Sequence, residues 1–171
     1  MNTLTTLARR CLAAFTIAPR RADWVLAGGL LPLFALATGV LGFATGLLHV
    51  TPLSVCWQPI VLISFFIPSL AEETLFRAYL PSWRETERPI IWVGGSTLIF
   101  VLWHIVQPFI WQGFAPFFWR ADFLAISATL GVICAVLRMR SGSLWPGVVF
   151  HWIVVAGWLT FLGGPRPGDV L

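Results

Sequence analysis

Five apolar runs, each about as long as a membrane is thick, constrain the fold more than any other feature of this sequence. They cover approximately residues 24–48, 57–80, 90–111, 121–140 and 143–163. At ~1.5 Å per residue, each run can cross the hydrocarbon core of a bilayer as a helix. The alternating pattern of barrel strands is absent, so only helices can satisfy the backbone groups of these runs in lipid. We therefore predict an all-α fold, a polytopic transmembrane bundle of about five spans.

The runs leave room for a single compact domain. Of the 171 residues, 58% are hydrophobic and 11% are charged, which is more apolar than soluble domains are. We expect one transmembrane domain over residues 23–163, an N-terminal segment over 1–22 and a short tail over 164–171. If the N-terminal segment is helical, its apolar side chains lie on the face opposite Arg9 and Arg10. This pattern indicates a helix on the membrane surface, and the alternative is a frayed tail. The apolar side chains are Leu4, Leu7, Ala8, Cys11 and Phe15.

All eleven basic residues are arginine, and their distribution predicts the orientation of the bundle. With five spans and a cytoplasmic N-terminus, only Arg120 and Arg166 lie outside, and the excess of arginine on the other side fits the positive-inside rule. Because the arginines are scattered between apolar runs, we predict no nucleic-acid partner. The arginines placed on the cytoplasmic side are Arg9, Arg10, Arg20, Arg21, Arg77, Arg84, Arg88, Arg138 and Arg140.

Few ionisable residues fall deep inside the runs. Glu72, Glu73 and Arg77 belong to the second run, His104 to the third and His151 to the fifth. A charged side chain near the bilayer centre costs at least ~2.5 kcal/mol, so such residues usually mark function. If the runs are helices, these residues lie at similar depths in the membrane, so side chains from all three runs could meet in one cavity. For any one of these residues alone, the alternative is a structural role: a glutamate and the arginine could form an ion pair, and the histidines could bond to nearby carbonyl groups.

The two adjacent glutamates have different helical neighbours. Glu73 and Arg77 are four residues apart, which suits an ion pair that offsets the burial of both charges. Glu72 is rotated by ~100° and shares its face with Phe76 and Tyr79. We therefore expect the two carboxylates to have separate roles.

A carboxylate and two histidines suit the activation of water for hydrolysis. Other hydrolytic chemistries fit less well, since the sequence has no HExxH motif and its aspartates lie at the ends of runs. Ser96, after two glycines, is a weak nucleophile candidate because it leaves the glutamates unexplained. The three cysteines have no CxxC spacing and indicate neither disulfides nor a zinc site. We predict no metal and no cofactor.

Three ordered motifs carry a resemblance to a known family. Residues 72–77 (EETLFR) match EExxxR, residues 100–104 (FVLWH) match FxxxH, and His151 lies on a later run. In this order and spacing, the chain resembles the CPBP (ABI) family of intramembrane glutamic proteases over roughly residues 57–160. That family includes the type II CAAX prenyl endopeptidases and proteins linked to bacteriocin processing and self-immunity.

The resemblance implies a metal-independent membrane endopeptidase that acts on a peptide or protein substrate in the bilayer, for example in the bacterial inner membrane. It implies that Glu72 and His104 activate water and that His151 helps to form the oxyanion hole. The supporting residues it implies are Glu73, Arg77 and Phe100.

The third motif departs from the family pattern. The family commonly has HxxxN, whereas Val155 occupies the asparagine position here, and Asn2 is the only asparagine in the chain. No nearby amide in the sequence is an obvious substitute. The alternative function is therefore a non-enzymatic immunity or scaffold protein on the same fold.

Overall fold

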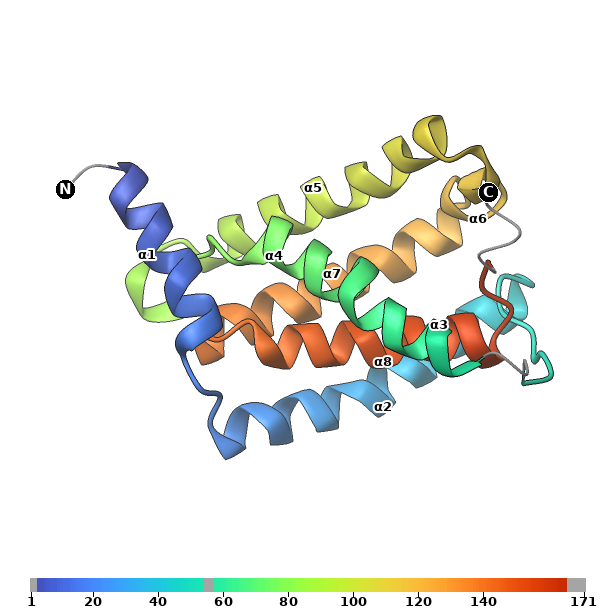
Figure 1. Cartoon of the computed structure of the whole chain (residues 1–171), viewed down its shortest axis with the longest axis horizontal. Helices are drawn as coiled ribbons and strands as arrows, with labels where there is room; N and C mark the ends of the chain where they lie inside the picture. The colour runs from blue at the N-terminus through green and yellow to red at the C-terminus, as the bar shows by residue number, and fades with distance from the viewer. Residues whose placement is uncertain (1–2, 54–56, 166–171) are drawn as a thin grey trace.

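The structure is a computed structural model that describes residues 3–53 and 57–165, and within these ranges it contains helices and no strands. The long helices lie side by side along the long axis of the molecule (Figure 1). This arrangement confirms the predicted all-α bundle. The helices are α1 (Thr3–Thr16), α2 (Arg21–Ala44), α3 (Trp57–Ser64), α4 (Ala71–Arg77), α5 (Pro89–Ile110), α6 (Ala115–Phe118), α7 (Ala121–Ser141) and α8 (Trp145–Phe161). A π-helical segment, η1 (Phe65–Leu70), joins α3 to α4, and short 3-10 turns cover Trp83–Glu85 and Gln112–Phe114.

Four of the five predicted spans are long and apolar enough to cross a membrane. These are α2, the segment Trp57–Arg77, α5 and α7, while α8 has 17 residues and falls below that length. The sequence predicts a fifth span over residues 143–163. The helix is shorter because Pro146 lies in its first turn and Gly163, just after its end, has a φ of 77°. At about 26 Å, α8 is still near the thickness of the hydrocarbon core, and it lies along the other helices through the bundle (Figure 1).

The second predicted span is interrupted, contrary to the continuous run expected over residues 57–80. Ile67 has φ −133° and ψ 115°, outside the helical region, and Pro68 follows it. Proline removes a backbone donor and disfavours helical geometry in the preceding residue. Helix α4 therefore starts anew at Ala71, with Glu72 and Glu73 in its first turn and both side chains buried.

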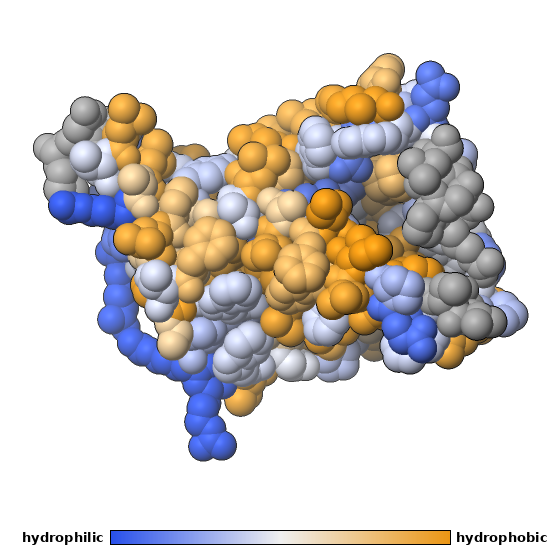
Figure 2. Space-filling model, in the orientation of Figure 1, coloured by the Kyte–Doolittle hydropathy of each residue, from blue (hydrophilic) through white to orange (hydrophobic). Residues whose placement is uncertain are grey.

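Apolar packing holds α2, α7 and α8 together. One core cluster combines Phe34 of α2, Leu130 and Leu137 of α7, and Phe150 of α8. Large apolar side chains on the outside of the bundle are exposed, and Val25 retains 74% of its accessible surface. The surface has an apolar middle with hydrophilic residues towards its two ends (Figure 2). This pattern fits helices that face lipid.

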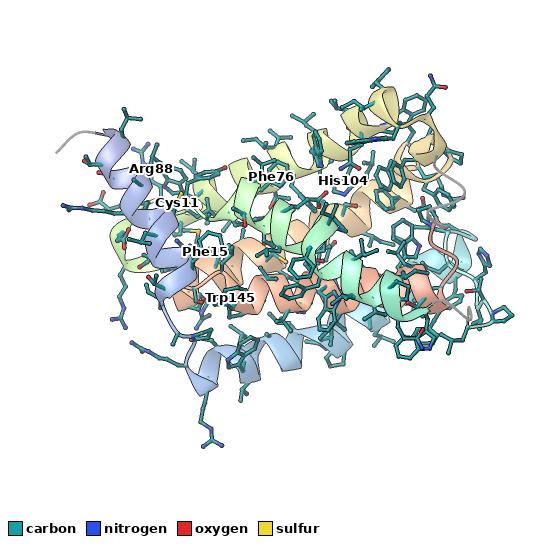
Figure 3. All side chains as sticks on the ribbon, in the orientation of Figure 1. Cys11, Phe15, Phe76, Arg88, His104 and Trp145 are labelled. Carbon is teal, nitrogen blue, oxygen red and sulfur yellow. The ribbon has the colours of Figure 1, made fainter. Side chains whose placement is uncertain are left out.

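The N-terminal segment forms a helix that packs across one end of the bundle. Ala14 of α1 is fully buried against Ala78, Leu144 and Val148. The backbone N–H of Leu144 donates to Ala14 O over 2.7 Å, and Phe15 of α1 lies next to Trp145 at the start of α8 (Figure 3). Residues 3–16 are therefore helical rather than frayed, while their position at a membrane surface stays a prediction.

Two of the arginines assigned to the cytoplasmic side are buried. Arg77 is 0% exposed and Arg138 is 2% exposed. The Nη2 atom of Arg138 donates to Ala78 O over 3.1 Å and to Arg10 O over 3.3 Å. These two side chains stabilise the interior and do not act as loop charges, which corrects the count for that side from nine to seven.

Candidate active site

One cavity of about 1090 Å³ brings together the three residues predicted to be catalytic. Glu72 reaches it from α4, His104 from α5 and His151 from α8, and His104 lies in the interior of the bundle (Figure 3). Most of the remaining wall is apolar. That wall comes from the halves of the helices that lie away from α1, over residues 31–43, 59–64, 103–111, 123–130 and 151–159. The polar site therefore opens into an apolar chamber at the far end of the bundle.

Glu72 is held through one of its two carboxylate oxygens. The indole N–H of Trp103 donates to Glu72 Oε1 over 3.2 Å, and the side-chain amide of Gln107 donates to the same atom over 3.3 Å. Among the described residues, Glu72 Oε2 has no hydrogen-bond partner, although it is buried. The carboxylate thus has one bonded oxygen and one oxygen without a hydrogen-bond partner in the described chain.

Glu73 has a different environment, as expected. Its Oε1 accepts a hydrogen bond from Arg77 Nη1 over 3.0 Å, which confirms the predicted ion pair. The same oxygen lies 3.0 Å from His151 Nδ1. The Arg77 and Glu73 side chains are 0% and 1% exposed, so this carboxylate is engaged in linking α4 to α8.

Phe100 lies at the centre of the site and contacts three of its members. The Arg77 guanidinium is 4.0 Å from the centroid of the Phe100 ring, a cation–π geometry. The rings of His104 and His151 lie 4.6 Å and 5.9 Å from it. The Phe100 side chain is 0% exposed, so it fixes the spacing between the buried arginine and the two histidines.

A backbone bond orients the His104 ring. His104 Nδ1 lies 2.8 Å from Phe100 O. A carbonyl oxygen only accepts, so Nδ1 carries the proton in this bond and Nε2 is left as the second position of the ring. The rings of Phe118 and Phe123 lie 5.2 Å and 5.5 Å from the imidazole and complete an aromatic enclosure. A short-range pattern in the sequence does not reveal these two phenylalanines.

His151 lies between the two glutamates. Its Nδ1 lies 3.0 Å from Glu73 Oε1, and its Nε2 lies 3.9 Å from Glu72 Oε2. The first contact is a hydrogen bond and the second exceeds hydrogen-bond length. A carboxylate only accepts, so Nδ1 donates to Glu73 and Nε2 faces the free oxygen of Glu72.

Two other readings of the sequence find little support in the geometry. The Ser96 hydroxyl is buried and donates to Phe76 O over 3.0 Å, which ties α5 to α4. Ser96 is not one of the residues that line the cavity. Within residues 3–53 and 57–165, no three His, Cys, Asp or Glu side chains are grouped as a metal site.

Sequence reasoning missed the two donors to Glu72. Two signals were available: Trp103 lies in the middle of its run, whereas most tryptophans lie near the ends of runs, and Gln107 is three residues after His104. Val155 does line the cavity, one turn after His151. The amide of Gln107 also lies in this site, but it donates from α5 to Glu72 Oε1, so the expectation that no amide substitutes for the asparagine of the third motif stays a prediction.

Comparison with known proteins identifies one family. The model of the family described as Type II CAAX prenyl endopeptidase Rce1-like matches residues 55–157, a range that includes every residue of the predicted site. No curated protein and no solved structure matches the chain significantly.

Proposed function

This chain belongs to the Rce1-like family of type II CAAX prenyl endopeptidases, and from that membership we propose that it is an integral membrane endopeptidase in which Glu72 and His104 activate water. The family membership supports proteolysis, and the apolar helices support an integral membrane protein. The catalytic assignment is a proposal built from the geometry of the cavity.

The environment of Glu72 carries the proposal. Its Oε1 is anchored by two neutral donors, while its Oε2 is buried at the cavity wall and has no hydrogen-bond partner among the described residues. Glu73 Oε2 is also buried without a hydrogen-bond partner among the described residues, but Glu73 is paired with Arg77 and does not line the cavity, whereas Glu72 does. A general base needs an oxygen that a water molecule can reach within hydrogen-bond distance.

The reaction follows from these positions. Water in the cavity gives a proton to Glu72 Oε2 as its oxygen attacks the carbonyl carbon of the scissile peptide. His104 Nε2, on a ring fixed through Nδ1, orients the water or shares the proton. The tetrahedral intermediate then collapses, the C–N bond breaks, and the proton held by Glu72 passes to the leaving amine nitrogen. The products are a carboxylic acid and an amine.

His151 has the position for stabilising the oxyanion. In its doubly protonated form it donates from Nδ1 to Glu73 and presents an Nε2–H to the cavity. An N–H aimed at a developing oxyanion lowers the barrier to attack. His151 would thus act in the oxyanion hole without the asparagine that the family commonly has at the position of Val155.

We also propose that the reaction needs no metal. The absence of a three-ligand grouping among the described residues supports this, because catalytic zinc sites use three protein ligands. Glu73 is bonded to Arg77 Nη1 and faces His151 Nδ1, so its Oε1 is not free to bind an ion.

The substrate class proposed is a peptide or protein segment at the membrane, and the prenylated CAAX end named in the family description is the first candidate. The apolar wall of the cavity suits a lipidated or apolar segment. We further propose a cytoplasmic N-terminus, because seven exposed or partly exposed arginines lie on α1, at the start of α2, before α5 and at the end of α7. The membrane we propose is a bacterial inner membrane.

The test combines a defined probe with an open search. Purified full-length chain in liposomes is given a quenched fluorescent peptide with a farnesylated CAAX end, and membrane proteomes are compared between cells that carry wild-type chain and Glu72→Gln. We expect Glu72→Gln to lose cleavage by about a hundredfold or more, as for a missing general base. Glu87→Gln, an exposed carboxylate, is the matched control and keeps full cleavage.

Two results would count against the proposal. Cleavage by Glu72→Gln at the wild-type rate would remove Glu72 from catalysis. A wild-type chain that cleaves neither the peptide nor any membrane protein would favour the non-enzymatic scaffold instead.

A further inference from the structure

Two residues on α5 converge on a single atom of Glu72. Trp103 and Gln107 are one helical turn apart, and both donate to Oε1, at 3.2 Å and 3.3 Å. Neither donor is charged, and no residue of the described chain makes a hydrogen bond to Oε2. The two oxygens of this carboxylate therefore differ in their environment.

We propose that Trp103 and Gln107 are positioning residues that hold Glu72 by its Oε1 and so leave Oε2 for the reacting water. This inference rests on the proposed function for the identity of the reaction. It goes further by giving each carboxylate oxygen its own role: Oε1 anchors the side chain through Trp103 and Gln107, and Oε2 takes part in the reaction.

The amide of Gln107 is fixed in one orientation. A carboxylate accepts hydrogen bonds and cannot donate, so the Gln107 side chain turns its NH₂ group towards Glu72. Gln107 is 8% exposed and Glu72 is 8% exposed, so water competes little for the bond. Two donors on one oxygen therefore fix the orientation of the carboxylate.

The charged groups near Glu72 are few. Glu73 and Arg77 lie on the same helix and are paired with each other, His104 faces the cavity from α5, and His151 Nε2 lies 3.9 Å away on α8. The described residues that α2, α3 and α7 contribute to the cavity wall are all uncharged. Within the described chain, the hydrogen bonds that orient the Glu72 carboxylate thus come from the neutral donors of α5.

The test uses dicyclohexylcarbodiimide, an apolar reagent that modifies protonated carboxyl groups in membranes and needs no substrate. Full-length Gln107→Leu and Trp103→Phe are prepared in liposomes at neutral pH, and modification of Glu72 is measured by peptide mass spectrometry. Both substitutions remove the donor and keep most of the side-chain volume. The controls are Gln112→Leu and Trp83→Phe, whose side chains are exposed.

We expect the rate of Glu72 modification to rise about tenfold in each variant, the effect of losing a hydrogen bond worth ~1.4 kcal/mol, because a carboxyl group that is no longer anchored meets the reagent with both oxygens. The controls should match wild type. With a cleavable peptide, kcat should fall at least tenfold while KM changes less than twofold, because the donors orient the base and do not bind substrate. A purely structural role would not change the modification rate.

Unchanged modification in both variants, with thermal midpoints near that of wild type, would overturn the inference. If Gln107→Leu fails to fold, Trp103→Phe decides the question alone. A wild-type chain without peptidase activity whose variants still show the tenfold rise would refute the proposed function and leave the assignment of the donors intact. An active wild-type chain whose variants show no change in modification would refute the assignment of the donors and leave the proposed function intact.

Discussion

The buried ion pair of α4 offers the sharpest test of how the site is stabilised. Replacing Glu73 with glutamine leaves the Arg77 guanidinium, 0% exposed, without a counter-charge. It also weakens the contact to His151, since Glu73 Oε1 serves both neighbours at 3.0 Å. We expect the variant to be less stable than wild type and to lose activity.

The size of the effect follows from the burial. Removing one partner of a buried pair costs about 3–5 kcal/mol because a charge stays uncompensated. For a chain of this length, 1 kcal/mol shifts the thermal midpoint by about 2–4 °C, so the midpoint should fall by about 6–20 °C. Surface changes would shift it far less.

The double variant Glu73→Gln/Arg77→Met separates charge from packing. With both charges absent, part of the stability should return, and the coupling between the two sites should lie in the range of about 0.5–3 kcal/mol. Recovery is incomplete because methionine cannot replace the cation–π contact of Arg77 with Phe100 at 4.0 Å, which contributes ~2 kcal/mol when desolvated.

The assay is thermal unfolding of the purified chain in detergent, followed by tryptophan fluorescence. Glu85→Gln, which removes a carboxylate whose side chain is 53% exposed, serves as the control. A Glu73→Gln midpoint within 2 °C of wild type, roughly the shift for 1 kcal/mol or less, would refute the ion-pair reasoning. So would a double variant that is less stable than Glu73→Gln alone.

Three further predictions concern packing, orientation and chemistry. Gly131→Ala should lower the free energy of unfolding by about 1–3 kcal/mol, because the new Cβ would lie 3.2 Å from both Arg77 Nη2 and Phe100 Cδ1. Gly95→Ala is the control: its Cβ meets nothing within 4 Å, so this change should be neutral or stabilising. The thermal midpoints of both variants test the prediction. A reporter fused after Leu171 should lie outside the cytoplasm, and a cytoplasmic signal would contradict the proposed orientation. Peptidase activity should survive strong chelators, and a loss that zinc restores would indicate a metallopeptidase.

Much of the fold could be predicted because lipid allows few alternatives. Apolar runs of this length have to form helices, since no water is present to bond their backbone groups. The i, i+4 spacing of Glu73 and Arg77 predicted their ion pair, and the structure contains it. The depth of Glu72, His104 and His151 along their runs predicted that they could share a cavity, and they line one.

The break in the second span was harder to predict. Pro68 was visible, but prolines also occur within α2 and α5, where the helix continues. What distinguishes η1 is the extended backbone of Ile67. Transmembrane helices tolerate proline when neighbouring groups satisfy the freed backbone, so the outcome depends on contacts that the local sequence does not contain.

The sequence by itself determined that the apolar runs are mostly helical, that Glu72, His104 and His151 lie at depth within them and that Glu73 and Arg77 lie one turn apart, because these follow from hydrophobicity and from the 3.6-residue period. Only the tertiary structure decided that Trp103 and Gln107 bond to Glu72 and that His151 bonds to Glu73. These contacts join different helices. Their lengths depend on how α4, α5 and α8 are rotated and displaced against one another, and side-chain packing across the whole bundle sets those positions.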